Sequence, residues 1–308
     1  DPSRLEQVKQ RFPAIQVSPE PDAALADPAV DAVVIATPSS THHALGRAAL
    51  LAGKHVLVEK PMATRAADAD ELCALAERNG RVLLVGHVFL HNTAVQRVKA
   101  YVEDGSLGRV HYVSMVRTNL GPIRTDVDAA WDLAAHDLSV ANYWLGAEPT
   151  AVNAVGGTWI NAGLADAVFL TFRYPDNVLV HVHASWLNPR KDRLVTVVGD
   201  RRMLTFDDMA PQEPLRIYDK QVTGQRSQSA AYVDTYATFR AQVRDGDILI
   251  PRVGTGEPLR AECEHFLDCI GRGVPPIGGG RAGAAVVRAL EAATRSMQNG
   301  GREEAVAK

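Results

Sequence analysis

The first hundred residues repeat one pattern, a short apolar run followed by an amphipathic segment, and this pattern restricts the fold more than any other feature. The apolar runs Ala32–Ala36, Val56–Val58 and Val82–Val88 predict buried strands. The remaining segments predict helices at Asp22–Leu25, Thr41–Ala52, Ala66–Arg78 and Thr93–Asp104, and a short strand at Ile15–Ser18. Strand–helix units of this length need a parallel sheet with helices on both faces, so the sequence predicts a doubly wound α/β domain.

From about Arg109 the pattern changes to strands that follow one another directly. Strands are predicted at Val110–Arg117, Val168–Tyr174 and Val178–Trp186, and Pro175-Asp176-Asn177 predicts a hairpin turn between the last two. We therefore expect an α/β domain over residues 1–118 and an α+β domain with a large, mostly antiparallel sheet over residues 119–308. The C-terminal helix is expected to pack back on the first domain.

Composition excludes several classes of protein. The 308 residues are 46% hydrophobic and 22% charged, with a net charge of −3 and no basic tract, which argues against a disordered chain or a nucleic-acid-binding protein. No apolar run is long enough for a membrane span, and no secretory signal opens the sequence given. The three cysteines, Cys73, Cys263 and Cys269, form no CxxC pair, so we expect a cytoplasmic protein with reduced thiols at core positions.

Ligands of doubly wound sheets bind outside the carboxyl ends of the strands, and two polar segments lie at such ends. Thr37–His42 follows the first buried strand and offers hydroxyls and a helix N-terminus to a ribose or a phosphate, although the segment taken alone is better explained as an ordinary helix cap. Glu59-Lys60-Pro61 follows the second strand. A lysine there can donate to a substrate hydroxyl, the alternative being a solvated loop lysine.

A third candidate is the segment from Trp131 to Asp137. Asp132 and His136 are four residues apart, so on a helix they share one face, where the carboxylate orients the imidazole for proton transfer. A helix-surface ion pair is the alternative. Arg117, Asn119 and Arg124 lie on the strand exit that leads to this helix and are candidates for binding a substrate phosphate or, alternatively, solvated loop residues. His181 and His183 are expected on one face of a strand, with no third ligand for a metal, so we expect no metal site.

The ordered motifs ATPSSTHH, VLVEKPM, VGHVF and WDLAAHDLS resemble the Gfo/Idh/MocA oxidoreductases, and ECEHFLDCI near the C-terminus resembles their nucleotide-sugar 3-dehydrogenase branch. The resemblance implies a Rossmann-type domain that binds NAD or NADP, and hydride transfer between that cofactor and a secondary hydroxyl of a sugar, chiefly a nucleotide sugar. It also implies a homo-oligomer, either a dimer or a tetramer. A catalytically inactive sugar or dinucleotide sensor, an NAD-dependent glycosidase and a polyol dehydrogenase are the alternatives.

The resemblance also assigns roles to residues. It makes Lys60 and His136 the catalytic pair, with Asp132 on the substrate side of the same helix. The residues that it implies or suggests for the cofactor are Thr37, Pro38, Ser39, His42, Glu59, Lys60 and Asn92. Those expected to bind substrate are Lys60, Arg117, Asn119, Asp132 and His136.

The glycine-rich fingerprint expected of the first strand of such a domain does not precede the Thr37 segment. A GxGxxG pattern does occur at residues 278–283, but turn-like residues precede it, so we interpret it as a loop leading into a helix at Ala284–Met297. We expect a further strand–helix–strand before Asp1 in the full-length protein. Without it, a gap of about 14 Å would separate the strand at Ile15–Ser18 from the next strand and expose apolar edges.

Overall fold

The computed structural model describes residues 1–160, 162–222 and 243–307. Its first part contains a parallel sheet of three strands, β1 (Ala32–Ile35), β2 (His55–Glu59) and β3 (Leu83–Gly86), in the order β1-β2-β3. The predicted α/β class is confirmed. Because the strands are parallel, their carboxyl ends meet at one edge of the sheet, where the candidate residues lie.

Two helices pack together against this sheet. The helix α3 (His42–Leu51) follows a short 3-10 turn, η1 (Ser39–Thr41), and α4 (Ala66–Arg78) follows β2. A side chain at Gly46 of α3 would lie 3.3 Å from Leu72 of α4, so glycine allows the two helices to pack closely. This packing fixes the position of the loop after β1.

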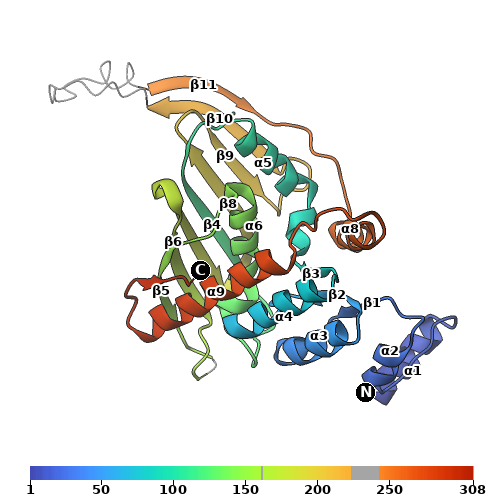
Figure 1. Cartoon of the computed structure of the whole chain (residues 1–308). Coiled ribbons are helices and arrows are strands. Elements are labelled where there is room, and N and C mark those ends of the chain that lie inside the picture. Colours follow the sequence, from blue (N-terminus) through green and yellow to red (C-terminus); the bar gives the residue numbers. More distant parts are fainter. Residues whose placement is uncertain (161, 223–242, 308) are drawn as a thin grey trace.

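The N-terminal helices α1 (Pro2–Arg11) and α2 (Pro21–Ala26) contain no buried residue and lie apart from the sheets (Figure 1). Asp1 caps α1, because its Oδ1 accepts the backbone N–H of Ser3. The predicted strand at Ile15–Ser18 is wrong: these residues form no strand, since no neighbouring strand of the described chain lies beside them to complete a ladder. The edge of β1 is exposed, with Val34 62% accessible.

The second sheet contains nine strands in the order β11-β10-β9-β8-β4-β7-β6-β5-β12. Only β4 and β7 pair in parallel among these described strands, so the sheet is mixed but mostly antiparallel. Their bounds are β4 (Val110–Leu120), β5 (Ala151–Gly157), β6 (Ala167–Arg173), β7 (Leu179–Ser185), β8 (Leu187–Gly199), β9 (Met203–Asp207), β10 (Leu215–Val222), β11 (Val243–Leu249) and β12 (Glu304–Ala305). The change of sheet falls between β3 and β4, and the division at residue 118 stays a prediction.

The predicted hairpin between β6 and β7 is confirmed. A 3-10 turn, η4 (Pro175–Asn177), joins the two strands, and Asp176 and Asn177 both have positive φ, which aspartate and asparagine tolerate. Alternate residues of β6 and β7 face the core or the outside of the sheet. Phe169 and His183 stack on the outer face with ring centroids 4.5 Å apart, while Leu170 and Val182 are buried.

Helices cover the inner face of this sheet (Figure 1). They are α5 (Thr93–Glu103) and α6 (Ala135–Leu145), preceded by the short turns η2 (Val88–His91) and η3 (Ala130–Ala134), and the C-terminal helix α9 (Gly280–Gln298). The helix α8 (Pro258–Arg272) packs against η2 instead. α9 packs on β5 and α6 of the second part and on α4 and β3 of the first. It therefore joins the two parts of the molecule.

The GxGxxG segment is a loop that leads into α9, as interpreted, although the helix begins at Gly280 rather than Ala284. Gly278 has φ +76° and its carbonyl accepts the N–H of Val85, so the loop lies along β3. A Cβ on Gly283 would lie 2.5 Å from Cγ2 of Val85, so glycine lets α9 approach the sheet. These glycines serve packing.

The three cysteines are unpaired, and the expectation for one of them is wrong. Cys73 and Cys269 are buried, but Cys263 is exposed because it lies on the outward face of α8.

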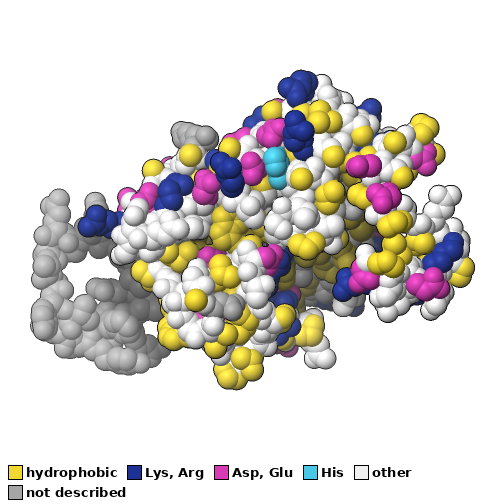
Figure 2. All heavy atoms as spheres, turned by 90° about the horizontal axis from the view of Figure 1, so that it is seen from below, with side chains coloured by type: hydrophobic (Ala, Val, Ile, Leu, Met, Phe, Trp, Pro, Cys, Tyr) yellow, Lys and Arg dark blue, Asp and Glu magenta, His cyan; other side chains and the backbone are white. Residues whose placement is uncertain are grey.

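The surface of the molecule is mixed in character. Seen from below, hydrophobic side chains are exposed in several patches between charged ones (Figure 2). Within the described ranges, no helix combines the length and hydropathy that crossing a membrane requires.

Candidate active site

The carboxyl ends of β2 and β3 place two chemically active residues next to each other. Glu59 pairs in register with Gly86, so the residues that follow, Lys60 and His87, leave adjacent strands at the same edge. A Cβ on Gly86 would lie 3.0 Å from the carboxyl group of Glu59, which shows that glycine leaves the room that this carboxylate occupies. Glu59 is half-buried and accepts the backbone N–H of Lys60.

Lys60 connects the first sheet to the helix that carries His136. Its Nζ donates to the carbonyl oxygen of Asp132 at 2.7 Å and lies 3.1 Å from Oδ1 of the same residue. The side chains of Lys60 and Asp132 are 13% and 18% exposed, so the ion pair is largely shielded from water. The Lys60–Pro61 peptide bond is cis. Two residues 72 positions apart in the sequence thus meet between the sheets.

Asp132 lies in η3, which is a π-helical turn rather than the regular helix that the spacing predicted. Its Oδ2 accepts the indole N–H of Trp186 at 3.2 Å, and its Oδ1 is also 3.4 Å from Nη1 of Arg124. Lysine, arginine and indole donors therefore surround one carboxylate and fix its orientation.

His136 follows in the first turn of α6 and is half-buried. Its ring lies edge-on to Phe89, with centroids 5.1 Å apart, and its buried Nδ1 has no hydrogen-bond partner among the described residues. Burial, and secondarily the charge of Lys60, lower the pKa of His136 well below its ordinary value. The imidazole is therefore neutral near pH 7 and able to accept a proton.

Arg117 is held within the protein. Its guanidinium makes hydrogen bonds of 2.8 to 3.0 Å with the carboxylate of Asp137, and both residues are buried. The guanidinium also lies 4.4 Å from the ring centroid of Phe89, which contacts His136. Arg117 thus packs against the same Phe89 ring that contacts His136. Its predicted role as a direct substrate ligand stays a prediction, as does that of Asn119, which is half-buried near the end of β4.

The segment after β1 divides into exposed and internal residues. Thr37 and Pro38 are exposed at the strand end, where a cofactor can reach them. His42 is 1% exposed, and its ring nitrogens lie 2.8 Å from the carbonyl oxygens of Pro61 and Thr37, so it ties this loop to the loop after β2. Ser39 is buried and accepts a hydrogen bond from Nη2 of Arg124 at 3.2 Å.

Asn92, the last predicted cofactor residue, caps α5. Its Oδ1 accepts the backbone N–H groups of Ala94 and Val95 at 2.8 and 3.4 Å. The residue also lines a cavity of about 280 Å³ beside Phe89 and Arg193. Its amide group thus has a structural role, and its approach to a nicotinamide remains a prediction.

Sequence reasoning missed three residues of this region and did not foresee the contacts of a fourth. Arg124, a candidate for binding phosphate, also bridges Ser39 and Asp132. An indole is typical of a core position, so Trp186 gave no signal of its bond to Asp132, and Phe89 carries no chemical signal at all. Glu262 of α8 is 1% exposed, and neither of its carboxylate oxygens has a partner among the described residues. Burial, and then the charge of Glu59, raise the pKa of Glu262 to about 7. A glutamate on an otherwise apolar helix face was the available signal.

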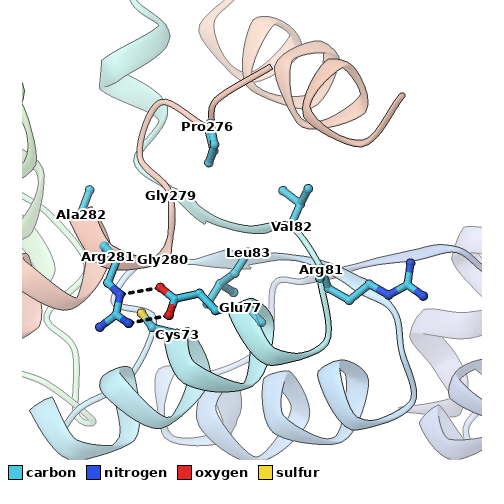
Figure 3. A pocket seen from close by; sticks show the side chains of 12 residues that line it. Cys73, Glu77, Arg81, Val82, Leu83, Pro276, Gly279, Gly280, Arg281 and Ala282 are labelled. Atoms are coloured by element: carbon cyan, nitrogen blue, oxygen red, sulfur yellow. Dashed lines mark hydrogen bonds and ion pairs between the residues drawn. The ribbon is translucent and has the colours of Figure 1, made fainter. Parts of the chain in front are cut away.

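A cavity of about 540 Å³ lies at the opposite, amino end of β3 (Figure 3). Figure 3 shows it between α4 and the loop that enters α9, with the Glu77–Arg281 ion pair at its edge and Cys73 in its wall. It is remote from the strand ends at which Lys60 and His87 lie.

In the described part of the chain, no cluster of three histidine, cysteine or acidic residues could hold a metal ion.

Comparison with known proteins agrees with this geometry. Residues 1–87 match the model of an oxidoreductase family with an NAD-binding Rossmann fold, and residues 95–205 match the GFO/IDH/MocA C-terminal domain. UDP-N-acetylglucosamine 3-dehydrogenase of Acidithiobacillus ferrooxidans is 30% identical over 272 residues, which are 88% of this chain and 79% of that enzyme. The chain belongs to the Gfo/Idh/MocA oxidoreductase family.

Solved structures agree with the family in fold. The structure of UDP-N-acetylglucosamine 3-dehydrogenase GnnA from A. ferrooxidans has a TM-score of 0.80 and 26% identity, covering 97% of this chain and 88% of that one. GenD2 from gentamicin A biosynthesis, in complex with NAD, has a TM-score of 0.78 and 26% identity, covering 98% and 86%. Myo-inositol 2-dehydrogenase of Thermotoga maritima is 25% identical over 270 residues, 83% of this chain and 79% of that enzyme.

The cofactor class expected from the sequence, a nicotinamide dinucleotide, is confirmed at the level of the family. The strand ends of this Gfo/Idh/MocA protein suit such a cofactor. Thr37 carries a hydroxyl and Glu59 a carboxylate at these strand ends, and the glycine at position 86 leaves room for the Glu59 carboxyl group. That these two groups bind ribose oxygens stays a prediction.

Proposed function

We propose that this oxidoreductase oxidises a ring hydroxyl of a nucleotide sugar, as its relative of 30% identity does with UDP-N-acetylglucosamine. The observation that carries the proposal is the junction of Lys60, Asp132 and His136, which combines a cationic donor, a fixed carboxylate and a neutral imidazole. Oxidation of a secondary alcohol needs such a set, because the hydroxyl proton and the hydride leave the substrate together.

His136 is the general base in this proposal. Its neutral imidazole accepts the hydroxyl proton, and the Phe89 ring and the Arg117–Asp137 ion pair hold it in place. The bound nicotinamide ring supplies the acceptor for hydride. Lys60 donates a hydrogen bond to the reacting oxygen and stabilises negative charge as the proton leaves.

The substrate class follows from the groups around this junction. Asp132 is an acceptor for a second sugar hydroxyl. Arg124 lies between Asp132 and Ser39, where its guanidinium suits the diphosphate of a nucleotide sugar. The sugar ring would then lie over Lys60, with the nucleotide extending past Arg124. Thr37, Pro38, Ser39 and Glu59 are proposed to line the dinucleotide.

A homo-oligomer is proposed from the outer face of the nine-stranded sheet. Tyr112, Phe169 and Leu194 are 45%, 45% and 40% exposed on that face, and apolar side chains gathered on one face are typical of a contact between protein subunits. Light scattering during size-exclusion chromatography tests this proposal. A monomer at micromolar concentration contradicts it.

The activity is tested with NAD and NADP against UDP-N-acetylglucosamine, other UDP- and TDP-sugars and myo-inositol, with the absorbance of reduced nicotinamide as the signal. Lys60→Met and His136→Asn are each expected to lower kcat by about 10²- to 10⁴-fold, the usual contribution of general acid–base groups. Lys99→Met is the control, because Lys99 pairs with Glu103 on α5.

Three results would contradict the proposal in different ways. Faster turnover of myo-inositol than of every nucleotide sugar would indicate a polyol dehydrogenase. Binding of dinucleotide without turnover of any substrate would indicate a sensor. Equal loss of activity in the Lys99→Met control would show that the variants act through folding.

A further inference from the structure

The proposed reaction releases a proton that has to leave a shielded site. A secondary alcohol and the oxidised nicotinamide give a ketone, the reduced nicotinamide and one proton: the C–H bond yields the hydride, and the O–H bond yields the proton to His136. Burial and the charge of Lys60 lower the pKa of His136, so its protonated form is short-lived. The proton must therefore pass to another group before the next turnover.

His87 lies where such a group is needed. It follows β3 directly beside Lys60, is 2% exposed, and has no hydrogen-bond partner for either ring nitrogen among the described residues. Burial, and then the charge of Lys60, lower the pKa of His87 to about 3, so the ring is neutral with one N–H and one free acceptor nitrogen. A neutral imidazole in this state can take a proton on one nitrogen and release another from the second.

A cavity of about 220 Å³ begins at His87. Its wall on α6 is made by Ser139, Asn142 and Tyr143, which are three, six and seven residues after His136 and hence on the same face of the helix. Nδ2 of Asn142 is buried and has no partner within the described chain. Most of the cavity lining is apolar, but His87, Ser139, Asn142 and Tyr143 supply polar groups along one wall. Because a water needs at least about 10–15 Å³ and two or more polar partners, this wall can hold a chain of waters.

The other end of the cavity reaches the surface. Gly146 and Glu148 line it and are exposed, whereas His87 is buried. The side chain of Glu148 is 51% exposed, and its Oε2 lies 3.2 Å from Nη2 of Arg288. A carboxylate at this mouth can accept a proton from cavity water and release it to bulk solvent.

We infer that this cavity is the proton exit of the enzyme, leading from His136 by way of His87 and cavity water to Glu148 at the surface. The inference rests on the proposed function, since it needs an alcohol oxidation to supply the proton. It gives a role to His87, a buried histidine without a hydrogen-bond partner among the residues that the structure describes. It also gives a role to the polar groups in the wall of the cavity that begins at His87.

Stopped-flow measurements with NAD and UDP-N-acetylglucosamine test the route, following hydride transfer by nicotinamide absorbance and proton release by an indicator dye. In the wild type both signals are expected to rise together. In Glu148→Gln, and in Ala285→Leu, which fills the cavity from α9, proton release is expected to lag by about tenfold while the first hydride transfer is unchanged. Glu303→Gln is the matched control, because Glu303 is a similarly exposed glutamate paired with Arg173.

A second measurement needs no turnover. In protein labelled with ¹⁵N-histidine, the ring N–H of His87 is expected to exchange rapidly with water, and about tenfold more slowly in Ala285→Leu. Coincident proton and hydride signals in both variants, or slow ring exchange in the wild type, would overturn the exit route while leaving the dehydrogenase in place. Absence of nicotinamide reduction by the wild type with every sugar would overturn the proposed function, and the route with it.

Discussion

Glu262 gives the sharpest test of the electrostatics beside the strand ends. The residue is 1% exposed, its carboxyl group has no hydrogen-bond partner in the described structure, and Glu59 lies near enough to disfavour its negative charge. These effects raise its pKa to about 7 from the ordinary 4.5. The folded protein therefore holds the proton more tightly than the unfolded chain does.

The sign of the pH dependence follows from that difference. The contribution of Glu262 to stability is complete below about pH 4.5 and is lost as the pH rises through about 7, because folding must then either keep a proton or bury a charge. The gap between the two pKa values corresponds to about 3 kcal/mol at 1.36 kcal/mol per unit. Glu262→Gln keeps the shape and remains neutral, so it avoids this loss.

The assay is urea unfolding of the wild type and Glu262→Gln at about pH 5 and about pH 8. The free energy of unfolding of the variant relative to the wild type is expected to rise by about 2–3 kcal/mol between these pH values. Glu264→Gln is the control, because Glu264 is exposed on the same helix and pairs with Arg260. A difference between Glu262→Gln and the wild type that does not change with pH would refute the reasoning.

The buried Arg117–Asp137 ion pair and the close approach of α9 to β3 at Gly283 give two more predictions. Arg117→Met should lower the free energy of unfolding by about 3–5 kcal/mol, because it leaves Asp137 buried without its cation. The double variant Arg117→Met/Asp137→Leu should recover most of that loss, and urea titration measures both variants. A double variant that is no more stable than the single one would contradict this prediction. Gly283→Ala should cost about 1–3 kcal/mol, because its Cβ would meet Val85, and a thermal midpoint equal to that of the wild type would contradict the close packing of α9.

Local patterns predicted the elements well where each element is stabilised by its own sequence. The three parallel strands, the helix Ala66–Arg78 and the hairpin turn at Pro175-Asp176-Asn177 are all present, because apolar runs, caps and turn residues act over a few positions. The strand at Ile15–Ser18 was predicted on the same grounds and does not form. A strand needs a neighbour to complete its hydrogen bonds, and its own residues do not supply one.

The candidate site was predictable only as separate residues. Lys60 and His136 stood out through their motifs, whereas the contact of Lys60 with Asp132 joins parts of the chain 72 residues apart. Nothing in the local pattern distinguished the buried Arg117, paired with Asp137, from an arginine free to bind substrate. Partner and burial depend on what the fold places around a side chain, and these decide its chemistry.

By itself the sequence determined the order of strands and helices and the chemical groups available at the strand ends, because both depend on neighbouring residues. The tertiary structure decided which of those groups meet. It placed His87 beside Lys60 through the register of two strands and turned the π-helical residue Asp132 toward the lysine. It also left Glu262 buried, with no partner in the described part of the chain. Proton affinity follows from burial and nearby charge, so the protonation states that the chemistry needs were set only when distant segments packed together.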